Sequence, residues 1–209
     1  MSEAAIRESI CRVGRSLFDR GLTHGASGNI SVRLPDGGLL ATPTNMSLGE
    51  LDPATLSRFD AAGRLVDGRA ATKEMPLHRA LYETRTVTGA VVHLHSTHSV
   101  AVSMLPDIDP DDVLPPLTAY YLMRVGRTAL LPYHRPGDPA VADAIRGLAG
   151  RYSSVLLANH GPVVGGDTLE AATWAVEELE QTSKLFLLLH GRSPRLIAAA
   201  EAEALRGGA

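Results

Sequence analysis

The sequence is poor in cysteine and aromatic residues, and it has no excess of charge of either sign. It contains one cysteine in 209 residues, 4% aromatic residues and a formal net charge of -3. A single cysteine excludes an intrachain disulfide and suits a reducing compartment, so we expect a cytoplasmic protein. Because Cys11 lies in an amphipathic helical pattern, we expect a small core residue there and not a nucleophile.

Three further absences limit the possible partners. The charge balance offers no basic footprint for nucleic acid and no polybasic patch for a membrane surface. No apolar run approaches the roughly 20 residues of a membrane span. The first residues include acidic side chains and no apolar core, so they do not form a secretory signal. We therefore expect no nucleic-acid partner and no membrane partner.

What the sequence does contain is typical of a globular protein. Hydrophobic residues make up 44% of the chain and charged residues 21%, with a mean hydropathy near zero. This length and composition fit a single domain, residues 1–209, that buries a substantial core.

The first part of the chain alternates helical and strand patterns. Apolar residues recur at helical spacing over 4–20, and Gly21 follows as a C-terminal stop. Turn residues at 35–38 separate two strands near 29–33 and 39–42, and a second hairpin is predicted over 56–66. Residues 72–82 then predict a helix with an early Glu and a Pro in its first turn.

The second part continues with both kinds of element. A strand is predicted around 91–95, and 96–105 has helical spacing. Residues 130–131 form a short strand, and Asp138 is a candidate cap for a helix through 148. Residues 154–162 read as one buried strand. Asp167 then caps a long helix to about residue 190, whose apolar face includes Trp174, and Pro194 begins a final helix.

Two histidines on the strand near 91–95 are the clearest chemical signal. His93 and His95 stand two residues apart, so on a strand both imidazoles leave the same face. Neutral imidazole is a common ligand for zinc-like ions. Because an isolated pair of this kind is often structural, a metal site requires further ligands elsewhere in the chain.

Two other residues are candidates for the missing ligands. His160 ends the predicted strand 154–162 at a Gly-Pro turn, where sites are commonly built, although a lone histidine there is more often structural. Glu74 lies near the start of the helix over 72–82, where its simplest role is a favourable charge at a helix N-terminus. Together, three imidazoles and one carboxylate would complete a shell for a zinc-like ion.

A possible anion site precedes these residues in the chain. The turn that contains Ser27, Gly28 and Asn29 is either a simple turn or a backbone nest that holds an anion such as phosphate. A second cluster of hydroxyl and amide groups occupies residues 42–45.

Five separated motifs in order resemble the class II aldolase/adducin family, which includes L-fuculose-phosphate aldolase and L-ribulose-5-phosphate 4-epimerase. They are Ser-Gly-Asn-Ile-Ser at 27–31, Thr-Pro-Thr at 42–44, Lys-Glu at 73–74, His-Leu-His at 93–95 and Asn-His-Gly at 159–161. Within the family, residues 72–74, 95–103, 120–126 and 135–138 look closest to the 3-oxo-tetronate 4-phosphate decarboxylases.

The resemblance implies a fold and a set of site residues. The fold would be a three-layer α/β/α sandwich around a mainly antiparallel sheet, assembled as a homotetramer with active sites between subunits. One divalent metal ion per subunit, with Zn²⁺ as the expected ion, would be held by Glu74, His93, His95 and His160. Glu74 would also be the acid/base, and Tyr120, or its neighbour Tyr121, would be donated across the interface.

The substrate implied by the resemblance is a small phosphorylated sugar acid. Its phosphate or carboxylate would be bound by six residues. These are Ser27, Gly28, Asn29, Thr44, Thr72 and Lys73. Lys73 stands where the fuculose-phosphate aldolases carry a serine, and its charge favours a substrate with a carboxylate, although a solvated lysine is equally compatible with the sequence.

Three functions are compatible with this resemblance. The first is metal-dependent decarboxylation of a 3-oxo-tetronate 4-phosphate to dihydroxyacetone phosphate and carbon dioxide, through a metal-stabilised enediolate. The second is a sugar-phosphate aldolase or epimerase. The third is a non-catalytic, adducin-like interaction module, which would not need the complete set of ligands. His98 follows the strand that carries the histidine pair, and we expect it to be structural or to support a ligand.

Overall fold

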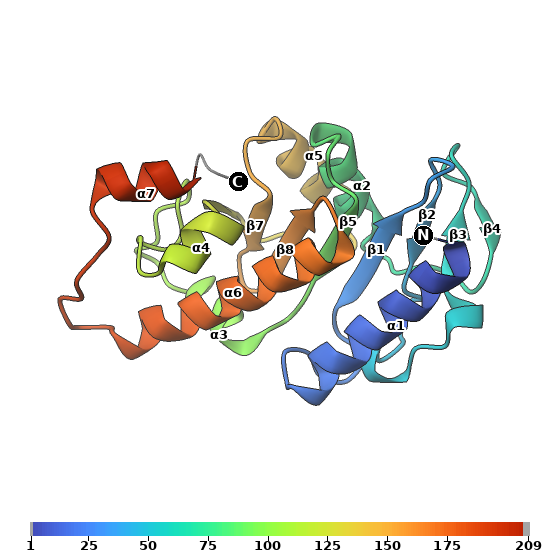
Figure 1. The fold of residues 1–209 in the computed structure, drawn as a ribbon, viewed down its shortest axis with the longest axis horizontal. Helices are drawn as coiled ribbons and strands as arrows, with labels where there is room; N and C mark the ends of the chain where they lie inside the picture. The colour runs from blue at the N-terminus through green and yellow to red at the C-terminus, as the bar shows by residue number, and fades with distance from the viewer. Residues whose placement is uncertain (1, 207–209) are drawn as a thin grey trace.

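Eight strands form one sheet in the computed structural model, which describes residues 2–206 (Figure 1). Residues 1 and 207–209, at the ends of the expected domain, lie outside the described part. The strand order is β4-β3-β2-β1-β5-β8-β7-β6, and every pair is antiparallel except β6 with β7. The strands are β1 Asn29–Arg33, β2 Leu39–Ala41, β3 Ser57–Phe59, β4 Leu65–Asp67, β5 Ala90–His93, β6 Thr128–Leu131, β7 Ser154–Leu157 and β8 Gly161–Gly166.

Helices cover both faces of this sheet. They are α1 Glu3–Asp19, α2 Met75–Thr84, α3 Thr97–Val102, α4 Ala119–Arg124, α5 Ala140–Gly147, α6 Leu169–Leu188 and α7 Ala199–Arg206. In Figure 1, α1 and α6 cross in front of the sheet, whereas α2 and α5 lie together at its far side. No helix within residues 2–206 has both the length and the apolar character needed to cross a membrane.

Successive strand residues feed two separate cores. On β5, Val92 packs in a cluster with residues of α1 and α6, and Val91 packs in a second cluster with residues of α2 and α5. The same alternation divides Leu156 from Val155 on β7, because neighbouring side chains of a strand point to opposite faces. The expected three-layer sandwich around a mainly antiparallel sheet is therefore confirmed.

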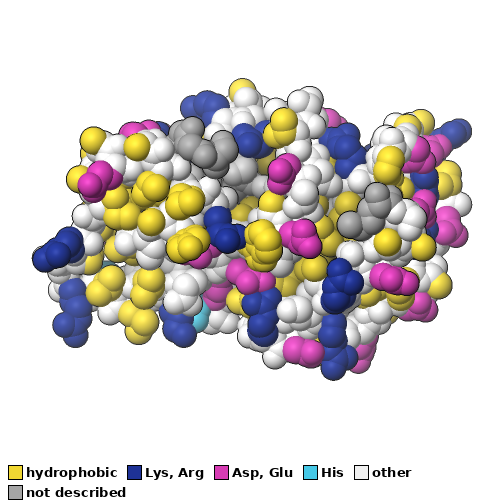
Figure 2. Space-filling model, in the orientation of Figure 1, with side chains coloured by type: hydrophobic (Ala, Val, Ile, Leu, Met, Phe, Trp, Pro, Cys, Tyr) yellow, Lys and Arg dark blue, Asp and Glu magenta, His cyan; other side chains and the backbone are white. Residues whose placement is uncertain are grey.

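Charged side chains of both signs are distributed over the surface. On the face shown in Figure 2, basic and acidic groups are intermingled, and hydrophobic side chains gather over the end that carries α4 and α7. The face in view therefore presents no continuous basic surface.

The segment 154–162 is the main error of the sequence-based prediction. It is not one strand but two, because the chain turns over residues 158–160 and returns as β8 beside β7. Asn159 adopts a left-handed conformation (φ 58°), which reverses the chain, and an asparagine tolerates this better than most residues. His160 consequently lies in a tight turn and not at the end of a long strand.

Helix boundaries differ from the expectations at two caps. The long helix is capped by Thr168, whose hydroxyl accepts a hydrogen bond from the Ala171 amide, so the predicted cap Asp167 lies one residue too early. Asp138 does accept a hydrogen bond from the Ala140 amide, but the cap position of α5 is occupied by Pro139.

The predicted start of the last helix and the predicted burial of Trp174 on α6 were also wrong. The final helix begins at Ala199 and not at Pro194, because the Ile197 amide donates to the Pro116 carbonyl instead of starting a helical turn. Trp174 was expected in the apolar core face of the long helix, but it is 52% exposed. The Arg124 guanidinium lies 4.8 Å from the centre of its ring, so Trp174 packs on the surface.

Candidate active site

The sheet brings three imidazoles to one point. β5 ends at His93, so His95 lies just past the strand, but the Nε2 atoms of these two rings still approach to 3.1 Å. The turn between β7 and β8 adds His160, whose Nε2 is 3.1 Å from the Nε2 of His95. β8 pairs with β5, and this pairing carries the turn to the histidine pair.

Glu74 completes the cluster from the start of α2. It occupies the cap position of this helix without capping it, because its side chain turns toward the imidazoles. Its Oε2 lies 3.3 Å from the Nε2 of His93, and its Oε1 lies 3.2 Å from the Nε2 of His160. One ligand atom from each of the four residues lies within 4.8 Å of the others.

The hydrogen bonds of His93 and Glu74 leave lone pairs available for a divalent cation. The Nδ1 of His93 lies 2.8 Å from the Pro162 carbonyl, which can only accept, so Nδ1 carries the proton and Nε2 offers a lone pair. Oε1 of Glu74 is buried and has no hydrogen-bond partner among residues 2–206. Three imidazole nitrogens and an unsatisfied carboxylate oxygen that face one another are the donor set of a zinc-like site.

The pKa shifts of Glu74 and His95 agree with this donor set. Burial raises the pKa of Glu74, but the nearby His93 and His160 rings and the Asn29 amide outweigh it and hold that pKa well below its usual range. Burial, together with His93 and His160, lowers the pKa of His95 to about 3. At neutral pH the cluster therefore contains an ionised carboxylate and a neutral His95 ring that is able to bind a cation.

A cavity of about 170 Å³ opens beside the cluster. All six predicted substrate-binding residues line it, together with Glu74, His95 and His160. The sequence analysis linked residues 135–138 to the decarboxylases but did not predict that Pro136 and Gly137 line the cavity, since no local pattern places this loop beside the histidines. A second cavity of about 490 Å³ shares His95, His160 and Pro136 with the first.

The backbone at Gly28 has a conformation that favours glycine, which is compatible with both a simple turn and an anion-binding nest. Gly28 has a φ of 81°, and a Cβ at this position would lie 3.1 Å from the His93 carbonyl oxygen. A side chain at this position would therefore be strained and would press on the strand that carries His93. Two neighbours in the cavity supply further polar groups: the Thr72 hydroxyl accepts from the Glu74 amide, and Lys73 is exposed.

Two of the predicted binding residues are already engaged within the protein. The Ser27 hydroxyl donates to the His24 carbonyl (2.6 Å) and so closes its own turn. The Asn29 side chain donates from Nδ2 to Oε2 of Glu74 (2.8 Å), and its Oδ1 faces the His78 ring. Asn29 thus contacts the candidate acid/base directly, a role that its position in a turn motif did not suggest.

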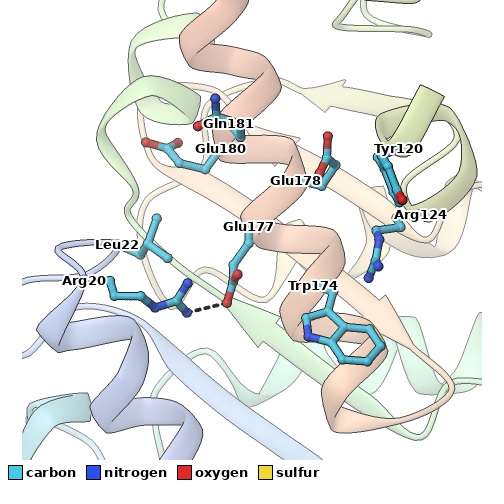
Figure 3. Close-up of a pocket in the computed structure, with 9 residues that line it drawn as sticks. All are labelled: Arg20, Leu22, Tyr120, Arg124, Trp174, Glu177, Glu178, Glu180 and Gln181. Atoms are coloured by element: carbon cyan, nitrogen blue, oxygen red, sulfur yellow. Dashed lines mark hydrogen bonds and ion pairs between the residues drawn. The ribbon is translucent and has the colours of Figure 1, made fainter. Parts of the chain in front are cut away.

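Within one chain, Tyr120 lies away from the cluster. It is 60% exposed on α4 and lines a separate pocket with Arg20, Arg124, Trp174 and residues of α6 (Figure 3). Tyr121 is fully buried, and its hydroxyl donates to the Thr128 hydroxyl (3.3 Å). Of the two tyrosines, only Tyr120 is exposed, and the Arg124 guanidinium lies 5.6 Å from the centre of its ring.

Two residues singled out in the sequence have structural surroundings. His98 pairs through Nδ1 with Oε1 of Glu180 (2.8 Å), and it is not part of the four-residue cluster. Burial and the charge of Asp52 raise the pKa of Cys11 to about 11, so its thiol stays protonated at neutral pH. Both observations agree with the expectations from the sequence.

The fold and the cluster together define a class of protein: an α/β/α sandwich in which the central strands and one helix N-terminus bring together three histidines and one glutamate, a donor set that suits a divalent ion. The model of the "Class II Aldolase and Adducin N-terminal domain" family matches residues 8–187. The chain belongs to this family, as its motifs indicated.

Individual relatives support the same assignment. A 3-oxo-tetronate 4-phosphate decarboxylase of Cupriavidus necator is 50% identical over 188 residues, which cover 90% of this chain and 86% of the relative. The L-fuculose phosphate aldolase of Escherichia coli is 30% identical over 169 residues, which cover 80% and 75%. The crystal structure of YgbL from Escherichia coli superimposes with a TM-score of 0.95 at 45% identity, over 98% of this chain and 99% of that chain. The chain is accordingly an enzyme of the lyase class.

Proposed function

We propose that this enzyme decarboxylates a 3-oxo-tetronate 4-phosphate to dihydroxyacetone phosphate and carbon dioxide. The observation that carries the proposal is the position of Lys73 in the polar cavity directly beside Glu74 and the histidine cluster. A lysine there supplies positive charge for a substrate that bears a carboxylate in addition to its phosphate. The name of the Cupriavidus necator relative, at 50% identity, supports the same substrate.

The reaction breaks the bond between C1 and C2 of the substrate. C1 leaves as carbon dioxide, and the electron pair moves through C2 toward the C3 carbonyl oxygen. C2 then takes up one proton, which gives dihydroxyacetone phosphate. A divalent ion held by Glu74, His93, His95 and His160 would supply positive charge that stabilises the electron-rich oxygen.

The side chains of the cavity have separate tasks in this proposal. Gly28, Thr44 and Thr72 would hold the phosphate, because the backbone is accessible at Gly28 and the two threonines carry hydroxyls. Lys73 would hold the carboxylate in the substrate before it departs. Glu74, as the acid/base, would deliver or relay the proton to C2, since no hydrogen bond from the described residues occupies its Oε1.

Finer features of the enzyme are part of the same proposal. We infer one Zn²⁺ per subunit, because three imidazoles and one carboxylate suit zinc. We infer a cytoplasmic homotetramer in which Tyr120 of one subunit reaches the site of the next, because Tyr120 is exposed and does not contact the cluster of its own chain. Ser27 and Asn29 would support the phosphate site through their turn.

An assay of gas release tests the reaction. Purified enzyme with added Zn²⁺ should release one carbon dioxide per dihydroxyacetone phosphate from a 3-oxo-tetronate 4-phosphate. Lys73→Met should raise KM for this substrate by about 10-fold, since it removes one charge-assisted contact of about 1.5 kcal/mol. The absence of gas release from any stereoisomer would contradict the proposal.

A sugar-phosphate aldolase is the second candidate. The L-fuculose phosphate aldolase of Escherichia coli is 30% identical, and the second cavity beside His95 and His160 offers room for an aldehyde fragment. Aldehyde release from fuculose or ribulose phosphates, without gas release from the oxo acid, would favour this candidate. A non-catalytic module is disfavoured because the complete ligand set is present.

A further inference from the structure

A row of buried polar side chains leads away from Glu74 through the layer between α2 and β1. Its members alternate between the helix and the strand: Glu74, Asn29, His78, Ser31 and Tyr82. The last four are at most 5% exposed. None of Ser31, His78 and Tyr82 lines the cavity, so the proposed reaction assigns them no role.

The periods of the two elements explain the row. Glu74, His78 and Tyr82 are four residues apart, so they lie on one face of α2. Asn29 and Ser31 are two residues apart, so they lie on one face of β1. Where this helix packs over this strand, the two sets interdigitate. The spacing of the three α2 residues was a signal in the sequence, but nothing there indicated which strand they would face.

The chemistry of each group determines the direction of the hydrogen bonds. A carboxylate only accepts, so the Asn29 amide donates from Nδ2 to Glu74 Oε2 at 2.8 Å. Its Oδ1 must then accept from Nε2 of His78. Nδ1 of His78 consequently accepts from the Ser31 hydroxyl at 2.7 Å.

The far end of the row fits the same direction. Since the Ser31 hydroxyl uses its proton on His78, its oxygen accepts from the Tyr82 hydroxyl at 2.9 Å. Every donor in the row thus points toward Glu74, and each group finds the partner that it needs. Burial lowers the pKa of His78 to about 3, which agrees with a neutral ring.

We propose that His78 is a positioning residue for Glu74, which acts by locking the Asn29 amide with its NH₂ group toward the carboxylate. The inference rests on the proposed role of Glu74 as ligand and acid/base. With Oε2 held by Asn29, Oε1 is the oxygen that remains without a hydrogen-bond partner at the cluster.

The physical need for such a lock follows from the asparagine side chain. An amide can rotate by 180° and exchange its oxygen and nitrogen at almost no intrinsic cost. In the rotated form, its carbonyl oxygen would face the ionised Glu74 in a buried site, which is repulsive. A donor at Nε2 of His78 excludes the rotated form, because that form would bring two N–H groups together.

The tautomer of His78 provides the first test and needs no variant. A long-range ¹H–¹⁵N spectrum of the ¹⁵N-labelled protein at neutral pH should show a neutral His78 with the proton on Nε2. The ring resonances that disappear in the spectrum of His78→Gln would be assigned to His78. A proton on Nδ1, or a doubly protonated ring, would overturn the proposal. This spectrum is independent of any substrate.

Paired variants provide the second test. In His78→Gln, the side-chain amide nitrogen reaches the former Nε2 position and still donates to Asn29. In His78→Asn, it reaches only the former Nδ1 position. Competition against a chromophoric chelator should show Zn²⁺ affinity lowered about 10- to 100-fold in His78→Asn and within about 3-fold of wild type in His78→Gln, by the usual effect of losing a partner of a ligand.

Kinetics and a stability control separate positioning from a general packing role. We expect kcat of His78→Asn to fall by the same 10- to 100-fold with KM nearly unchanged. Leu81→Val, a fully buried change on the same helix, should lower the melting temperature without lowering Zn²⁺ affinity. If the two His78 variants lose affinity equally, or if Leu81→Val loses it too, the proposal is wrong.

The remaining outcomes are also informative. If His78→Asn does not fold, Ser31→Ala is measured instead: it leaves His78 Nδ1 without a donor, and the proposal requires a loss of Zn²⁺ affinity at least 3-fold greater than in Leu81→Val. If the wild-type enzyme binds Zn²⁺ but releases no carbon dioxide, the proposed reaction fails. The tautomer and the metal affinities still decide the role of His78.

Discussion

At the scale of single residues, two of the four candidate ligands are held by a neighbouring group outside the cluster. The Pro162 carbonyl fixes the tautomer of His93, and Asn29 takes one oxygen of Glu74. Within residues 2–206, the ring nitrogens of His95 contact only His93 and His160, so no hydrogen bond outside the cluster holds this ring. Replacing His95 therefore removes a ligand without breaking a structural hydrogen bond elsewhere.

We expect His95→Ala to fold normally and to lose its metal ion. An open three-ligand site would hold the ion weakly, and turnover should fall by about 10³-fold, since a bound ion contributes several kcal/mol to the transition state. Metal content by mass spectrometry and kcat/KM check this expectation. His190→Ala, at an exposed histidine after α6, is the matched control and should keep both. Full activity of His95→Ala would refute the ligand assignment.

At the scale of secondary-structure elements, α6 holds the start of α3 in place through Glu180. Its Oε1 accepts from the His98 amide (2.9 Å), and its Oε2 accepts from the amide (2.8 Å) and hydroxyl (2.7 Å) of Ser99. Although Glu180 is 7% exposed and burial alone would raise its pKa, these donors and the His98 ring outweigh burial and lower that pKa. α3 begins two residues after His95, so this contact also supports the cluster.

Glu180→Gln should destabilise the protein in a pH-dependent way. Since the pKa of Glu180 is lower in the folded than in the unfolded protein, its contribution is complete above about pH 4.5 and is lost as the pH falls through the folded-state pKa. We expect a loss of about 2 kcal/mol in the free energy of unfolding at pH 7. The difference from wild type should shrink toward pH 3.

Urea denaturation at several pH values measures both effects. Glu170→Gln is the control, because Glu170 is an exposed carboxylate in the first turn of the same helix, and its change should stay within about 0.5 kcal/mol. A difference for Glu180→Gln that is constant with pH would show that the carboxylate charge does not stabilise the fold.

At the scale of the whole molecule, the cluster joins elements that are far apart in the sequence. Glu74 comes from the start of α2, His93 from the end of β5 with His95 just beyond it, and His160 from the turn before β8. An ion bound to all four residues would stabilise the folded state, because the unfolded chain offers no comparable site. Metal binding and folding should therefore be coupled.

We expect Zn²⁺ to raise the melting temperature of metal-stripped protein. At about 1,000 times the dissociation constant, the stabilisation is about 4 kcal/mol, which for a chain of this size corresponds to roughly 8 to 16 °C. Differential scanning calorimetry with and without Zn²⁺ measures the shift. In His95→Ala the shift should be much smaller, and an equal shift would mean that the ion binds outside the cluster.

The sequence by itself determined the candidate ligands and most of the elements. Periods of 2 and 3.6 residues are local properties, so the strand that carries His93 and the helix after Glu74 could be predicted from neighbouring residues. Local patterns failed where tertiary contacts decide. The strand over 154–162 reads as one apolar run, and only the pairing of β7 with β8 and of β8 with β5 shows why the chain turns at Asn159.

The tertiary structure decided which of the predicted groups meet. The sheet order places β1 and β8 on either side of β5, and this brings His160 and Asn29 to the histidine pair. The packing of α2 over β1 alone revealed that His78 and Ser31 support Glu74 through Asn29. Such contacts join residues about 45 to 50 positions apart, and their formation depends on the whole core and not on any local pattern of residues.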